Sequence, residues 1–149
     1  MPSTPLRELI PVLQEAIAPV ILISGVGLLL LSLTNRFGRA VDRSRQLAKE
    51  MRGVSKEEQA LLARQVEILF RRASLIRLSI ILATTSLLLA ALLIIGLFLT
   101  ALMKLEMGLL LALIFMGCML SLILSLIAFI QDIHLSLVAL KLELGEERD

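Results

Sequence analysis

The sequence is poor in the residue types that most often carry chemistry. It has one cysteine, Cys118, one histidine, His134, and neither tryptophan nor tyrosine. A single cysteine excludes an intrachain disulfide and a thiolate cluster, and a lone histidine lacks the other ligands that a metal site needs. Phosphate-binding-loop, zinc-protease and serine-hydrolase motifs are also missing. We therefore expect no enzyme activity, no cofactor and no metal site.

Charge is missing from three long apolar runs. Residues 17–34, 78–103 and 107–130 contain no Asp, Glu, Lys, Arg or His. A helix needs about 20 mostly apolar residues to cross the hydrocarbon core of a bilayer. The runs predict an all-α integral membrane protein, with a single membrane domain over residues 1–149 and three transmembrane helices. No carboxylate lies within these spans, where a proton relay would need one.

The charges that are present are distributed unevenly. Residues 35–77 have eleven basic and five acidic side chains, a net charge of +6, whereas residues 131–149 have a net charge of −3. Lys and Arg bias a loop toward the cytoplasm, and acidic residues count little in this rule. We expect the N-terminus outside, segment 35–77 and the C-terminus in the cytoplasm, and a short outer turn at 104–106. The rival interpretation is a re-entrant first segment.

The cytoplasmic segment is predicted to be a helical hairpin, 36–77, that continues the first two spans. Gly53 suits a helix end with a positive φ, and Ser55 with Glu58 has the spacing of a capping box. A further cytoplasmic helix is expected at 131–145. Pro11 and Pro19 should interrupt the first helix, and Pro19 is a candidate hinge.

Apolar residues on this hairpin recur at helical spacing, which predicts two buried faces. The first comprises Phe37, Ala40, Val41, Ala48 and Met51, and the second comprises Leu62, Val66, Leu69, Ala73 and Ile76.

Small residues recur every four positions in the third span, at Gly117, Ser121 and Ser125. Such a pattern lets helices approach closely in lipid, either within one chain or between subunits. A three-span chain of this size has little interior of its own, so we expect a homo-oligomer.

Arginines cluster where the first span leaves the membrane. Arg36, Arg39 and Arg43 share one side of a continuing helix, and Asp42 can pair with Arg39 or Arg45. Three interpretations stay open. The cluster is a stop signal that also touches anionic lipid heads, an Arg–Asp network that fixes the helices, or the positive mouth of a pore.

The motif formed by Asn35, Arg36, Arg39, Asp42, Arg43 and Arg45, together with Pro19, resembles a bacterial membrane family known as domain-of-unknown-function family 2721. The resemblance extends from about residue 9 to 140 and is most specific over 35–45. It implies a small multi-span protein of the bacterial inner membrane and no particular activity.

Two functional hypotheses follow, and we favour the first because the weakly polar residues of the first span have no obvious role facing lipid. In the first, the protein is a homo-oligomeric ion channel, with Ser24, Gly25, Ser32 and Asn35 lining the path and Arg36, Arg39 and Arg43 lining the cytoplasmic mouth. In the second, it is a non-conducting scaffold or regulatory protein that binds an unknown protein partner through its cytoplasmic helices. We expect no nucleic-acid binding, because acids are mixed among the bases and few aromatic residues accompany them.

Overall fold

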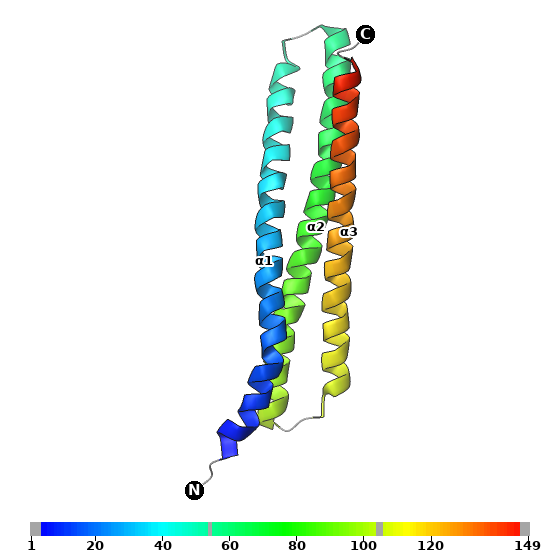
Figure 1. Cartoon of the computed structure of the whole chain (residues 1–149). Coiled ribbons are helices and arrows are strands. Elements are labelled where there is room, and N and C mark those ends of the chain that lie inside the picture. Colours follow the sequence, from blue (N-terminus) through cyan, green and yellow to red (C-terminus); the bar gives the residue numbers. More distant parts are fainter. Residues whose placement is uncertain (1–3, 54, 104–105, 147–149) are drawn as a thin grey trace. The chain divides into compact units, whose positions relative to one another are not determined.

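Three long helices account for the structure, a computed structural model that describes residues 4–53, 55–103 and 106–146. They are α1 (Thr4–Glu50), α2 (Lys56–Met103) and α3 (Gly108–Glu146) (Figure 1). Each contains a stretch that is long and apolar enough to cross a membrane. The all-α prediction is confirmed for the described residues, which contain no strand. Lys104 and Leu105, in the predicted outer turn, lie outside them.

α1 and α2 extend beyond their apolar runs. α1 continues from Asn35 to Glu50, and α2 begins at Lys56, well before its apolar stretch. α1 closes with a tightened last turn, in which Arg52 N–H donates to the Lys49 carbonyl at 3.2 Å and Gly53 N–H donates to the Glu50 carbonyl at 3.3 Å. Gly53 does not have a positive φ, so that prediction is wrong. Hydrogen bonds to the carbonyl of the third preceding residue satisfy the last carbonyls of the helix, so a residue with a positive φ is not needed.

The capping box predicted at the start of α2 is confirmed. The Ser55 backbone N–H donates to Glu58 Oε2 at 3.2 Å, and the Glu58 N–H donates to Ser55 Oγ at 3.4 Å. Each side chain thus accepts a hydrogen bond from the backbone N–H of the other residue, at a position where the helix provides no carbonyl acceptor of its own. This local signal fixes the residue at which the chain turns back.

We expect Ser55→Ala to lower the free energy of unfolding by about 1 kcal/mol, because it removes the side-chain acceptor at the helix start. Thermal unfolding of the purified full chain in detergent measures the change. Ser74→Ala is the control, since Ser74 is exposed within the same helix. Equal effects of the two changes would contradict a role for the cap.

The prolines do not interrupt α1, contrary to expectation. Pro11 and Pro19 both lie inside the continuous helix. A proline removes one backbone hydrogen bond, and a helix can accommodate it by bending instead of breaking. Figure 1 shows such a bend within the blue N-terminal part of α1. Pro19 itself is buried, and its role as a hinge stays a prediction.

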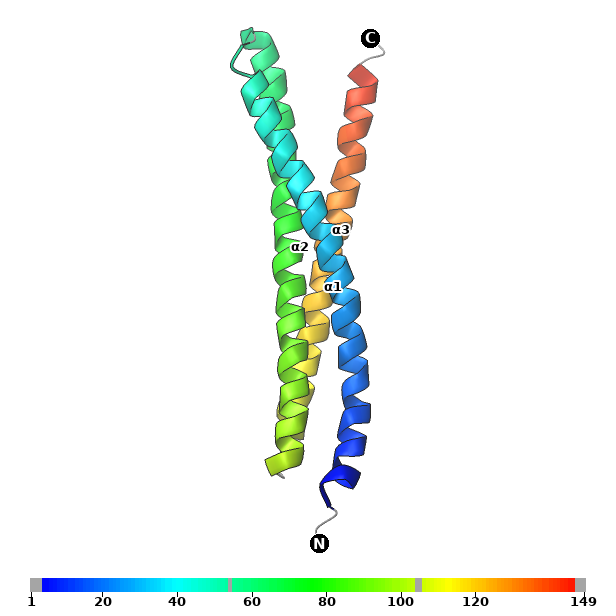
Figure 2. The ribbon, with the colours of Figure 1, turned by 90° about the vertical axis from the view of Figure 1, so that its left-hand side faces the viewer.

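The chain divides into two compact units, and every helix contributes a segment to each. The first unit comprises residues 1–30 and 82–123, and the second comprises residues 31–81 and 124–149. In the second unit, the C-terminal end of α3 diverges from the tip of the α1–α2 hairpin (Figure 2). This divergence agrees with the exposure of Leu137 near the end of α3.

Apart from Ala16, the buried residues described in α1 recur every seven positions. They are Pro19, Val26, Leu33, Ala40 and Leu47. A seven-residue repeat is the mark of coiled-coil packing, in which the effective period is 3.5 residues per turn. The predicted face used a period of 3.6 and placed Ala48 inside, whereas the structure buries Leu47 and exposes Ala48. At 100° per residue, Leu47 lies about 20° from Ala40 and Ala48 about 80° from it, so the error came from centring the face on the wrong side of Ala40 and not from the period itself. All five residues predicted for the face of α2 are buried or half-buried.

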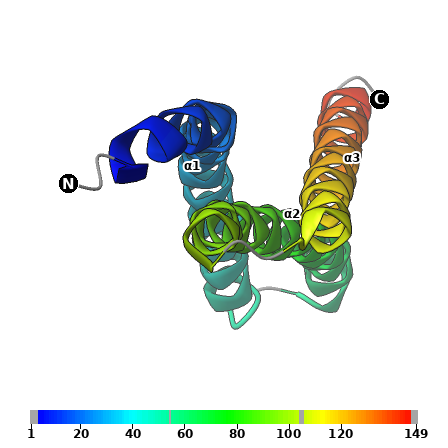
Figure 3. The same ribbon diagram turned by 90° about the horizontal axis from the view of Figure 1, so that it is seen from below.

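α2 and α3 share a second kind of heptad, built largely from small residues. The buried positions alternate in steps of three and four: Ile76, Ser79, Ala83, Ser86, Ala90 and Leu93 in α2, and Cys118, Ser121, Ser125, Ala128 and Asp132 in α3. Such residues let two backbones come close. Figure 3 views the helices from the end where α2 terminates and α3 begins.

Hydrogen bonds to backbone carbonyls tie this seam together. In the first unit, Ser121 Oγ donates to the Leu82 carbonyl at 2.7 Å and Cys118 Sγ donates to the Ser86 carbonyl at 3.2 Å. In the second unit, Ser79 Oγ donates to the Ser125 carbonyl at 2.5 Å, and Ser125 Oγ donates to the Ser79 carbonyl at 2.8 Å. We call these residues the serine seam.

Candidate functional site: an arginine cluster around Asp132

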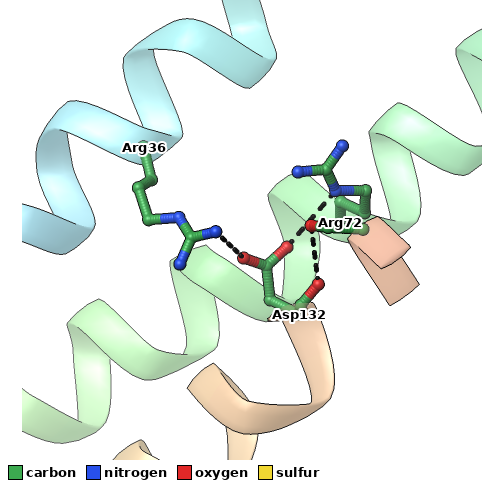
Figure 4. A network of polar contacts seen from close by, with 4 residues as sticks. Arg36, Arg72 and Asp132 are labelled. Carbon is green, nitrogen blue, oxygen red and sulfur yellow. Dashed lines mark hydrogen bonds and ion pairs between the residues drawn. The ribbon is translucent and has the colours of Figure 1, made fainter. Parts of the chain in front are cut away.

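A buried carboxylate joins all three helices of the second unit. Asp132, on α3, has a fully buried side chain. Its Oδ1 lies 3.5 Å from Arg72 Nε on α2, and its Oδ2 lies 3.9 Å from Arg36 Nη2 on α1 (Figure 4). A buried charge is costly unless oppositely charged groups surround it. The two arginines therefore hold Asp132 in place, and Asp132 in turn fixes both guanidinium groups.

The network is not fully closed. The 3.9 Å contact is an ion pair but is too long for a hydrogen bond, and Asp132 Oδ2 has no hydrogen-bond partner among the described residues. Ser136 Oγ bonds the Asp132 backbone carbonyl, at 2.9 Å, and not the carboxylate. Arg36 also lies over the Phe129 ring, 5.1 Å from its centroid, where the ring face attracts the cation.

Beside this network is a half-open cavity of about 220 Å³ between α1 and α2, at whose rim Arg39 and Arg43 are exposed. Its lining combines four arginines with three apolar side chains: Arg36, Arg39, Arg43, Arg72, Ala40, Leu69 and Ile76. The spacing of three and four residues places the α1 arginines on one helical face, as the sequence predicted. With Asp132 as the neighbouring carboxylate, four guanidinium groups leave a net charge of +3 in the cluster.

The other residues predicted for this region lie elsewhere. Asp42 and Arg45 are exposed and outside the cavity lining, and Asp42 pairs with neither Arg39 nor Arg45. An Arg–Asp network does exist, but its carboxylate comes from α3.

The candidate pore-lining residues Ser24, Gly25, Ser32 and Asn35 are all exposed on α1. Of the candidate packing residues, Ser121 and Ser125 belong to the serine seam. Gly117 faces Leu89, 3.6 Å from the position that a Cβ would occupy.

Sequence reasoning missed the two central residues, Asp132 and Arg72. Asp132 lies close in sequence to His134, the lone histidine, which is exposed. Among the described residues, no group of three His, Cys, Asp or Glu side chains could hold a metal ion. The signal that could have found Asp132 is its register, because it follows Cys118 and Ser125 at seven-residue steps on the buried face. An acid in that register needs a basic partner from another helix.

These features define an all-helical protein with three helices able to span a membrane and a buried Arg–Asp–Arg network. The chain belongs to the family described as "Protein of unknown function (DUF2721)", whose model matches residues 16–142. The suspected resemblance is therefore confirmed. No curated protein and no solved structure matches the chain.

Proposed function

We propose that this protein is a homo-oligomeric, non-conducting scaffold or regulatory protein of the bacterial inner membrane, which binds a partner protein through its cytoplasmic helices. Its N-terminus faces outward, and the second unit contains the cytoplasmic parts of the helices. One observation favours a non-conducting protein over an ion channel. The α1 arginines line a cavity within their own chain, and Arg36 is bound to Asp132 and Phe129 of that chain. An anion-selective mouth would need these groups at an axis between subunits.

The apolar surface supports the homo-oligomer. Only 11–22% of the residues in the three most apolar windows are buried within the chain, so the remainder must face lipid or another copy. On α1, small and weakly polar residues interrupt that exposed surface at Ser24, Gly25, Ser32 and Asn35. Such residues gain little from lipid contact but allow two helices to approach closely. We propose that they form the contact between copies.

The ion channel is the second candidate, and the same exposed residues favour it. If several copies turned this side of α1 toward a common axis, Ser24, Ser32 and Asn35 would offer polar groups to a water-filled path. The arginine cluster would then lie beside the path instead of lining it.

A pair of glycine substitutions tests the subunit contact. We expect Gly25→Leu to split the oligomer, because the larger side chain holds the helices apart. Gly27→Leu is the matched control. Both glycines are exposed, and a Cβ added at either position meets nothing within 4 Å inside the chain. The mass of the detergent-solubilised complex measures the result. An unchanged mass for Gly25→Leu would contradict the proposed contact.

Conductance recordings separate the two functional candidates. We expect no single-channel currents from the wild-type protein in planar bilayers. Reproducible currents that are absent from protein-free bilayers would overturn the non-conducting proposal, and a change in their anion preference with Arg39→Glu, but not with Arg45→Glu, would place the arginine cluster near the path. Arg45 is the control because it is exposed on the same helix and outside the cavity.

A further inference from the structure

The arginine cavity has more positive charge than the chain itself neutralises. Arg36 and Arg72 share the carboxylate of Asp132, whereas Arg39 and Arg43 line the same cavity without an ion pair among the described residues. Like charges brought together repel one another. The repulsion is least screened at Arg36 and Arg72, which are about a quarter exposed, and water screens part of it at Arg39 and Arg43, which are exposed. A bound anion would remove this unfavourable energy, so the cavity favours one.

The geometry also favours a particular class of anion. The two guanidinium groups near Asp132 are held by that carboxylate, and Arg36 is additionally held by the Phe129 ring. Groups that are already oriented lose less conformational entropy when a ligand binds. Guanidinium groups bind phosphate oxygens through paired hydrogen bonds, and several such groups suit an ion with several oxygens better than a carboxylate with two.

Size is consistent with this choice. The cavity of about 220 Å³ far exceeds the roughly 10–15 Å³ that a single water requires. It therefore has room for a phosphate group and part of whatever that group is attached to.

We propose that the cavity lined by Arg36, Arg39, Arg43 and Arg72 is a binding site for one phosphate group. The group comes either from a phosphate-bearing lipid head or from a soluble phosphate ion. The site does not depend on the non-conducting role proposed above, because it lies within a single chain.

Thermal unfolding of the full chain tests the proposal. The protein is stripped of lipid in a maltoside detergent, which contains no phosphate, and sodium chloride keeps the ionic strength constant. Inorganic phosphate and short-chain phosphatidic acid are titrated separately. A ligand that binds only the folded state raises the unfolding midpoint in a saturable way. A rise with inorganic phosphate identifies a soluble source, and a rise with phosphatidic acid alone identifies a lipid head.

A matched pair of double variants locates the site. Arg39→Gln with Arg43→Gln removes two cavity arginines that take no part in the Asp132 network. Each change removes a charged hydrogen-bond donor from the cavity, so we expect roughly hundredfold weaker binding. Arg45→Gln with Lys49→Gln removes the same charge, at the same spacing, on the same helix but outside the cavity. This control should bind within about twofold of wild type.

Two results would overturn the proposal. The first is the absence of any saturable rise in the midpoint with either phosphate or phosphatidic acid. The second is an equal loss of binding in both double variants, which would reveal attraction to overall positive charge instead of a site. Neither result bears on conductance or on the mass of the complex, so failure here is distinguishable from failure of the proposed function.

Discussion

Replacing Arg36 and Arg72 together by leucine is expected to lower the free energy of unfolding by about 3–5 kcal/mol. The double change leaves the Asp132 carboxylate fully buried with no counterion and no hydrogen-bond donor. Removing the carboxylate should cost less than removing the arginines, because the Arg36 and Arg72 side chains are about a quarter exposed, at 27% and 23%. In Asp132→Asn, both guanidinium groups can still reach water by extending their side chains.

A rescue experiment separates this explanation from simple loss of packing. Adding Asp132→Asn to the Arg36→Leu, Arg72→Leu variant removes the unpaired charge, and we expect it to recover about half or more of the lost stability. Buried ionic groups can be replaced by neutral ones at little cost when all partners change together. Thermal unfolding in detergent measures all three variants. If Asp132→Asn destabilised the double variant further, the carboxylate would not depend on these arginines.

The second large effect is expected in the serine seam. Ser125→Leu should lower the free energy of unfolding by about 2–4 kcal/mol, because it forces a bulky side chain into a close helix contact and breaks two hydrogen bonds with Ser79. Ser125→Ala, which keeps the small size, should cost only about 0.6 kcal/mol for the lost donor.

Ala112→Leu is the control for added bulk in the same helix, since Ala112 is exposed. Its effect on thermal unfolding should be near zero. A similar loss for Ala112→Leu and Ser125→Leu would show that α3 does not distinguish its two faces, and the assignment of the seam would be wrong.

Much of the fold could be predicted because its signals are local. Three apolar runs specify three helices, and the Ser55–Glu58 spacing specifies where α2 begins. Both depend on neighbouring residues only. The prolines were misjudged because a penalty for one lost hydrogen bond was treated as a helix stop. Ala48 and Leu47 were exchanged because the buried face was centred on the wrong side of Ala40, and the side of a helix that meets its neighbours depends on packing that the helix alone does not reveal.

The site was harder to predict because its partners are far apart in sequence. Arg36, Arg39 and Arg43 were found, since they occupy one face of one helix. Their carboxylate was sought nearby, at Asp42, but the structure provides Asp132 from a helix that begins about seventy residues later. Ion pairing between helices depends on register, and the heptads of all three helices must be aligned before Arg36, Arg72 and Asp132 can be placed together.

A double-mutant cycle between Arg72 and Asp132 tests the Arg–Asp–Arg network most directly. Each residue is changed to alanine alone and then together, and the free energy of unfolding is measured in detergent. We expect a coupling energy of about 1–3 kcal/mol for this pair, and additivity within about 0.5 kcal/mol for the control pair of Arg77 and Asp132. Arg77 is exposed on the same helix and forms no ion pair with Asp132 in the described structure. Additive effects for Arg72 and Asp132 would contradict the network.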